Sequence, residues 1–139
     1  MAFGMIQLAF SACALGEEET TYDILKWLGN CYWNNNMVST HDPGKTFNVD
    51  ICGGYPSLVM KMLAYAEPGL PCTPREWSEG SLKGAALRGG IVINDLSWSG
   101  ENVTATLVSR IDQTVKVELR GQYVEDIELK AGMPQTISF

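Results

Sequence analysis

The hydrophobic pattern of this 139-residue chain changes its period near the middle, and this change constrains the fold more than any other feature. Up to residue 66, apolar residues recur three and four positions apart, which is typical of amphipathic helices. From residue 90 onward apolar and polar residues alternate, as at Val103, Ala105 and Leu107, which predicts strands with one buried face. We therefore predict an α+β protein with helices first and a small antiparallel sheet or sandwich last.

Helix-breaking residues separate the two parts. Three prolines between residues 68 and 74 interrupt any helix that would continue from the first part. The sequence therefore predicts a partial α-helical segment over residues 1–66, a linker over residues 67–89 and a carboxyl-terminal β domain over residues 90–139.

The first part predicts three helices. Residues 1–16 carry no charge, and we expect them to form a helix that neighbours bury on several sides, inside a larger fold. The segment lacks the basic residue that precedes a signal-peptide core and is too short to cross a bilayer. A second helix should follow Gly16 with Thr20 or Thr21 as its N-cap. A third should begin near Pro56, because proline suits the first helical position.

Charge and cysteine spacing exclude several classes of protein. The net charge is −6 and the pI is about 4.7, without a cluster of Lys and Arg, so a nucleic acid is not the expected partner. A neutral ligand such as a sugar is compatible with this balance. The four cysteines form no C-x-x-C pair, so we expect buried free thiols rather than a zinc site or a disulfide scaffold. We expect neither a metal nor another cofactor.

The long segment between the second and third helices, residues 34–54, is the best place to look for a site. Its apolar residues indicate that it is ordered. Asp50 stands between Val49 and Ile51, which imply partial burial, and partly buried carboxylates are frequent at active sites. The alternative is that Asp50 shapes a turn or caps the next helix. His41, the only histidine, either closes a turn or contacts a ligand.

Two further groups of residues each admit two interpretations. The stretch CGGYPS either cradles an anion with its backbone N–H groups or uses Gly53 and Gly54 to turn sharply into a helix. The aromatic residues Trp27, Trp33 and Trp77 either stack on sugar rings or pack with one edge in water.

Two adjoining stretches of the sequence resemble a known enzyme family. They are FNVDICGGYPSLVMKMLAYAEPG, which begins at Phe47, and LPCTPREWSEGSLKGAALRGG, which ends at Gly90. With the short β segment that follows, they resemble the carboxyl end of glycoside hydrolase family 95, the α-L-fucosidases and related α-L-galactosidases. That family has the pattern F-x-(I/V)-D before a glycine-containing turn and a helix. A later pattern of tryptophan, glycine and arginine is matched by Trp77, Gly80 and Arg88.

This resemblance implies a fold and a chemistry. Family members carry the active site on an (α/α)6 barrel that a β domain follows, so residues 1–66 would be the last helices of the barrel. They hydrolyse with inversion: a glutamic acid protonates the leaving group, and asparagines polarised by the aspartate of the motif activate the water. Asp50 matches that aspartate. His41 lies where members often carry a histidine, which implies a sugar contact. The acid and the asparagines would lie upstream, so the chain alone should be inactive.

The implied substrate is an oligosaccharide with terminal L-fucose or L-galactose, and the full-length protein would be secreted or periplasmic. Many members read D-G-N-F-G where this chain reads DICGG from Asp50, so the resemblance does not fix the sugar. We expect no nucleic-acid or membrane partner, and we expect self-association through helix faces left exposed by a partial barrel. The alternative function is a non-catalytic carbohydrate-binding or interaction module.

Overall fold

A computed structural model describes residues 1–64, 72–119 and 122–138. The described residues form three helices and seven strands, and every strand pairing within the sheets is antiparallel. The predicted α+β class is therefore confirmed. The chain divides into two compact units, Met1–Lys61 and Met62–Phe139, which are described separately below. Within the described ranges, no helix combines the length and the apolar character that crossing a membrane would require.

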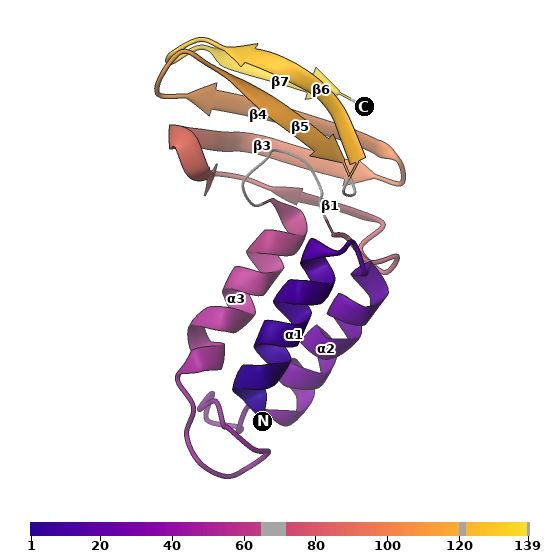
Figure 1. The fold of residues 1–139 in the computed structure, drawn as a ribbon, viewed down its shortest axis with the longest axis vertical. Helices are drawn as coiled ribbons and strands as arrows, with labels where there is room; N and C mark the ends of the chain where they lie inside the picture. The colour runs from indigo at the N-terminus through magenta and orange to yellow at the C-terminus, as the bar shows by residue number, and fades with distance from the viewer. Residues whose placement is uncertain (65–71, 120–121, 139) are drawn as a thin grey trace. The chain divides into compact units, whose positions relative to one another are not determined.

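Helix α1, Ala2–Ala14, opens the first unit (Figure 1). One side of it is buried, and the residues on that side are Ala2, Ile6, Ala9, Ala12 and Cys13. The other side is open to solvent and carries Gln7 and Ser11 as well as apolar residues: Phe3 is 49% exposed and Leu8 52%, and Leu15 after the helix is 78% exposed. Within the described residues the neighbouring helices cover a single face of α1, and burial on further sides inside a larger fold stays a prediction.

Helix α2, Glu18–Cys31, begins earlier than the sequence predicted. Gly16 adopts a left-handed φ of 73°, which ends α1 and lets the next helix start almost at once. Glu18 and Glu19 occupy the first turn, where the helix dipole favours negative charge. Thr21 is not the N-cap. It lies inside the helix, is fully buried, and donates a 2.7 Å hydrogen bond to the carbonyl oxygen of Glu17.

Helix α3, Asp50–Leu63, also starts before its predicted position, and Pro56 lies inside it. The side-chain oxygen of Asn48 accepts a 3.2 Å hydrogen bond from the Ile51 N–H, which is the bond that an N-cap residue makes. The helix can therefore begin without a proline at its first position. Because the start is at Asp50, Gly53 and Gly54 are helical residues and do not form the expected turn.

Gly54 sets the distance between α3 and α1. A Cβ atom at this position would lie 2.9 Å from Cγ2 of the buried Ile6, closer than packed carbon atoms approach. Gly29 of α2 has a similar role, because a Cβ there would lie 2.8 Å from the hydroxyl oxygen of Tyr55 in α3. Helix α3 therefore meets α1 at Gly54, and it meets α2 at Gly29 through the Tyr55 side chain.

Substituting the two adjacent glycines of α3 tests this packing. A Cβ atom added at Gly53 would meet no other atom within 4 Å, so Gly53→Ala should stabilise the helix by about 1 kcal/mol. Gly54→Ala has the same gain in helix propensity but overpacks against Ile6, which costs about 1–3 kcal/mol. Urea unfolding should rank Gly53→Ala above Gly54→Ala in stability. Equal stabilities for the two variants would show that α1 and α3 do not approach each other at Gly54.

The second unit is built from seven strands, which form a main sheet of five antiparallel strands and a separate pair of antiparallel strands. Their order in the main sheet is β1-β3-β4-β7, with β2 also paired to β3, and β5 and β6 form a separate hairpin. The bounds are β1 Glu79–Leu82, β2 Ala85–Ala86, β3 Ile91–Ser99, β4 Asn102–Ser109, β5 Gln113–Leu119, β6 Gln122–Leu129 and β7 Pro134–Ser138. Strands β1 and β2 fall within the expected linker, of which residues 67–71 lie outside the described residues.

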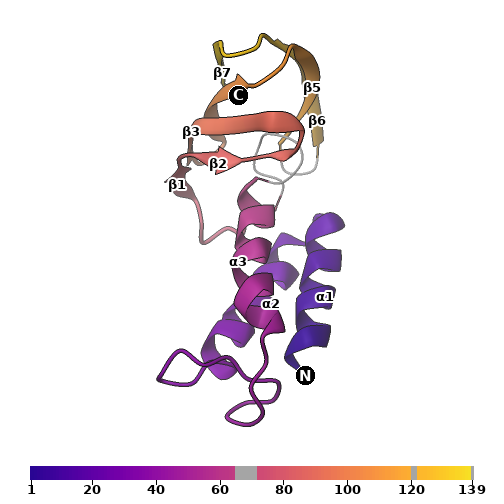
Figure 2. The ribbon, with the colours of Figure 1, turned by 90° about the vertical axis from the view of Figure 1, so that its left-hand side faces the viewer.

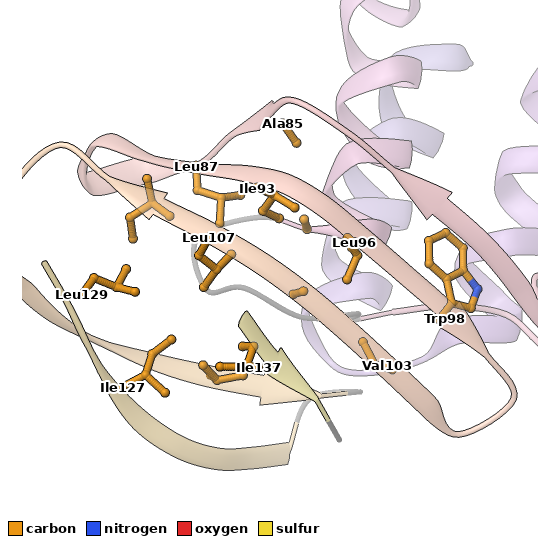
Figure 3. Packing of buried hydrophobic residues seen from close by; sticks show 14 residues of the cluster. Ala85, Leu87, Ile93, Leu96, Trp98, Val103, Leu107, Ile127, Leu129 and Ile137 are labelled. Atoms are coloured by element: carbon orange, nitrogen blue, oxygen red, sulfur yellow. The ribbon is translucent and has the colours of Figure 1, made fainter. Parts of the chain in front are cut away.

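The core of the second unit lies between the sheet and the hairpin (Figure 3). The predicted alternation is confirmed in β4, where Val103, Ala105 and Leu107 are at most 1% exposed. Ile127 and Leu129 of the hairpin belong to the same apolar cluster. Each fully buried leucine or isoleucine contributes about 1.5–3 kcal/mol relative to an exposed one, so this shared core holds the two layers together. Ile137 of β7 belongs to the same cluster, and residue 139 lies outside the described residues.

A carboxylate at the turn before β5 offers a test of local geometry by pH. Asp112 accepts a 2.8 Å hydrogen bond from the Ala131 N–H and pairs with Lys130 at 3.4 Å. The Ala131 N–H and then the Lys130 charge hold the pKa of Asp112 below its ordinary value of 3.8. The stabilisation is therefore present above pH 3.8 and lost as the pH falls through the lowered pKa.

Carbon-detected NMR should find the Asp112 carboxyl titrating below pH 3.8. The variant Lys130→Met should raise this pKa only part of the way, because the backbone hydrogen bond is the larger cause. A pKa at or above 3.8 in the unsubstituted chain would show that the Ala131 contact is not made.

Candidate functional site

The loop of residues 32–49 between α2 and α3 folds back on itself beyond the ends of the helices (Figure 2). Isolated antiparallel bridges join Trp33 to Ser39 and Thr40 to Phe47. Polar side chains, rather than the apolar ones that indicated order in the sequence, hold this loop: Ser39 and Thr40 are fully buried. Met37 is 75% exposed and Phe47 62% exposed.

The buried Asn48 lies at the centre of this loop. Its backbone N–H donates to the carbonyl oxygen of Ser39 at 3.0 Å, and the Ser39 hydroxyl donates back to the Asn48 carbonyl. Its side-chain Nδ2 donates to Asp50 Oδ2 at 2.9 Å and lies 3.2 Å from His41 Nδ1. The structure therefore brings the two predicted site residues, Asp50 and His41, together through a third residue.

Asn48 itself was missed as a site residue, although the sequence contains a signal for it. Asparagine is among the preferred N-cap residues, and here it stands just before a carboxylate, which is favourable in the first turn of a helix. An N-cap interpretation of Asn48 would have moved the predicted start of α3 to Asp50. It would also have placed Asp50 at a helix start rather than in a turn.

Asp50 is exposed, so the expected partial burial of its carboxylate is wrong. Val49 is 66% exposed, whereas Ile51 is fully buried. The reason is helical geometry: from Asp50 onward the chain is helical, and consecutive residues point about 100° apart, so a buried Ile51 directs the residue before it outward. The Asp50 side chain accepts no hydrogen bond from a backbone N–H of the described residues, so it does not cap the helix. It accepts from the Asn48 amide instead.

The cysteines and acidic residues give no sign of a metal centre. No disulfide joins the four cysteines; Cys13 and Cys72 are buried as expected, whereas Cys31 is half-buried and Cys52 is exposed. Cys52 Sγ lies 2.9 Å from the Ser39 hydroxyl oxygen. In the parts of the chain that the structure describes, no three residues of the metal-binding types gather in one place.

The aromatic residues of the first unit mainly contact one another. Trp27, which is 46% exposed, meets the buried Tyr32 edge to face with 5.7 Å between ring centroids. Trp33 meets Tyr55 in the same way at 6.2 Å. These contacts fit the packing interpretation of the tryptophans, with one edge of Trp27 left in water.

The tryptophan and glycine pattern of the second stretch is explained by packing within the second unit. Gly80 pairs with Trp98 across β1 and β3, and the indole ring lies over the glycine. The Trp98 N–H donates a 2.8 Å hydrogen bond to the carbonyl oxygen of Trp77. Gly84 and Gly89 have φ values of 71° and 75°, a conformation that favours glycine. These residues therefore have structural roles within the β unit.

No family model matches this chain, and no curated protein matches it either. A functional interpretation therefore depends on two observations, the geometry of the His41–Asn48–Asp50 cluster and the sequence pattern around it.

The contact between Gly80 and Trp98 predicts a large effect of a small substitution. A Cβ at position 80 would lie 2.7 Å from Trp98 Cη2, and the ring is held by its hydrogen bond to Trp77. Gly80→Ala should therefore destabilise the β unit by about 1–3 kcal/mol, whereas Ser81→Ala, at the next and exposed position, should have little effect. Thermal unfolding followed by tryptophan fluorescence measures both. An unchanged melting temperature in Gly80→Ala would contradict the packing of Trp98 on this glycine.

Proposed function

We propose that this chain is the carboxyl-terminal part of an inverting glycoside hydrolase that resembles the α-L-fucosidases and α-L-galactosidases. In this proposal α1, α2 and α3 are the last helices of an (α/α)6 barrel, and the antiparallel unit is the β domain after it. Asp50 polarises the amide groups that activate the attacking water, and His41 contacts the sugar. The substrate is an oligosaccharide with terminal L-fucose or L-galactose.

The observation that carries the proposal is the state of the Asp50 carboxylate. One oxygen, Oδ2, is held by the Asn48 amide at 2.9 Å. The other oxygen accepts no hydrogen bond from a described residue, and the side chain is exposed at the start of α3. A carboxylate held in this way can accept a second amide N–H from another element. An amide that donates to a carboxylate becomes a better acceptor through its own oxygen, and this is what a water-activating asparagine needs.

The exposed face of α1 gives independent support. Phe3 and Leu8 lie on the exposed side of α1 and Leu15 follows its end, and each is about half exposed or more. An apolar helix face in water is a liability that neighbouring helices normally cover. In the proposal, earlier barrel helices cover it in the full-length protein, and the chain by itself associates with other copies through the same face.

The proposal also explains why the chain alone should not turn over substrate. Inverting hydrolysis needs a second carboxyl group about 6.5–9.5 Å from the base side, to protonate the leaving group. The three consecutive glutamates at residues 17–19 are exposed or half-exposed at the start of α2. They stabilise that helix start, so the acid is assigned to the upstream part of the protein.

Extending the reading frame upstream of Met1 tests the assignment. We expect a continuous frame that encodes further helices, a glutamic acid and paired asparagines. The protein expressed from it should hydrolyse an aryl α-L-fucoside or α-L-galactoside, and ¹H NMR should detect the inverted anomer first. A stop codon with a ribosome-binding site directly before Met1 would contradict the proposal and favour the binding-module alternative. Calorimetry of the chain with fucosylated oligosaccharides would then measure that binding.

Substitution of Asp50 tests its role in the same full-length protein. Asp50→Asn should lower kcat by about 10²–10⁴-fold, because a neutral asparagine side chain polarises a neighbouring amide less than the Asp50 carboxylate does. In the 139-residue chain by itself the same substitution should hardly change stability, since the side chain is exposed there. Asp42→Asn, in the same loop but outside the cluster, is the matched control and should retain activity. An Asp50→Asn protein with full kcat would remove Asp50 from the mechanism.

A further inference from the structure

The side-chain amide of Asn48 is fixed in one orientation by its partners. Its oxygen accepts from the Ile51 N–H at 3.2 Å, and its nitrogen donates to Asp50 Oδ2 at 2.9 Å. Rotating the amide by half a turn would set its oxygen against the Asp50 carboxylate and its nitrogen against the Ile51 N–H. Both contacts would be repulsive in a side chain that is 7% exposed. The atom that faces His41 Nδ1 at 3.2 Å is therefore the nitrogen.

This orientation determines where neutral His41 carries its proton. An amide nitrogen can only donate, so His41 Nδ1 must accept through its lone pair. A neutral imidazole that accepts at Nδ1 carries its hydrogen on Nε2. His41 is half-buried, and its Nε2 makes no hydrogen bond to a described residue. His41 therefore presents an N–H donor at the atom that is available to a ligand.

Asp50 presents the complementary group. Its Oδ2 is occupied by Asn48, and its second oxygen is open and can only accept. The Asn48 amide thus lies between His41, which offers a donor at Nε2, and Asp50, which offers an acceptor at its second oxygen. A sugar hydroxyl can accept a hydrogen bond from the Nε2–H of His41, whereas a purely anionic group would be repelled by the nearby Asp50 carboxylate.

We propose that Asn48 is a positioning residue, which holds the Asp50 carboxylate and fixes His41 in the Nε2–H form, so that His41 donates to a neutral hydroxyl-bearing ligand while Asp50 keeps its second oxygen for a further amide. The catalytic consequence rests on the proposed hydrolase function. The effect on His41 is a property of the chain itself and can be measured without any substrate.

The substitution Asn48→Asp tests the effect on His41. The new side chain has nearly the same shape and keeps an oxygen for the Ile51 N–H, but it offers His41 Nδ1 an acceptor in place of a donor. The substitution is combined with Asp50→Asn, so that the second oxygen of residue 48 faces an amide and not the Asp50 carboxylate. The proton of neutral His41 should therefore move from Nε2 to Nδ1. Long-range ¹H–¹⁵N NMR at about pH 9, where an ordinary imidazole is neutral, distinguishes the two forms. His41 is the only histidine, so the spectrum needs no assignment.

Asn36→Asp, combined with Asp50→Asn in the same way, is the matched control, because it makes the same change of charge in the same loop. Asn36 is exposed and bonds the Val38 N–H instead of the cluster. The His41 spectrum of this variant should match that of the unsubstituted chain. A proton on Nδ1 in the unsubstituted chain, or a spectrum of the variant with Asn48→Asp and Asp50→Asn identical to it, would overturn the assignment of Asn48.

Asn48→Ser separates positioning from folding. Serine is also a good N-cap, so α3 should retain its start, but it has no amide to hold Asp50 and His41. Circular dichroism should show unchanged helix content, while His41 loses its fixed tautomer. In the full-length enzyme, kcat should fall by about 10²-fold because Asp50 is no longer oriented. A protein that hydrolyses no glycoside would contradict the proposed function alone, since the NMR result on the chain decides the role of Asn48 separately.

Discussion

The buried amide of Asn48 is the interaction on which the organisation of the first unit depends. Burying an amide without partners costs several kcal/mol, and this one has a partner at each of its hydrogen-bonding atoms. Its oxygen starts α3 at Asp50, and its nitrogen ties the helix start to His41 in the preceding loop. The candidate site therefore results from the same side chain that stabilises the start of α3.

Close approaches at glycine determine the spacing of elements in both units. In the first unit, the absence of a side chain at Gly54 leaves room for Ile6 of α1. In the second unit, Gly80 leaves room for the ring of Trp98 in the same way. These contacts are steric and local, so they specify which residues face each other more strongly than general apolar character does. They also explain part of the sequence pattern that resembles a hydrolase family. The glycine of that pattern at position 80 serves packing, and the aspartate at position 50 has no such structural duty beyond its bond to Asn48.

The sequence predicted the element types well because they follow from repeated patterns. Only a strand with one buried face fits the alternation through Val103, Ala105 and Leu107, and all three residues are buried. Helix boundaries were less accurate, since Thr21 and Pro56 are good terminal residues that also tolerate a place inside a helix. The sequence analysis placed the second helix after Gly16 but took a later threonine as its N-cap, and it missed the cap at Asn48 that sets the start of α3. The candidate site was predicted only in part, for a related reason. Asp50 and His41 were selected as individual residues, and their meeting depends on a loop closed by buried polar residues, which carry no hydrophobic pattern for a sequence analysis to detect.

The exposure of Asp50 limits what it can do without further chain around it. Two charges 4 Å apart interact by about 1 kcal/mol in water and by about 4 kcal/mol at the effective dielectric constant of a protein surface. A carboxylate surrounded by water therefore polarises a neighbouring amide only weakly. Under the proposed function, the upstream helices that supply the asparagines also exclude water from Asp50. They would bury the exposed Phe47 and Val49 beside it, and the driving force for that contact is the apolar area removed from water. The same step that completes the fold would thereby strengthen the electrostatic interaction on which the chemistry depends.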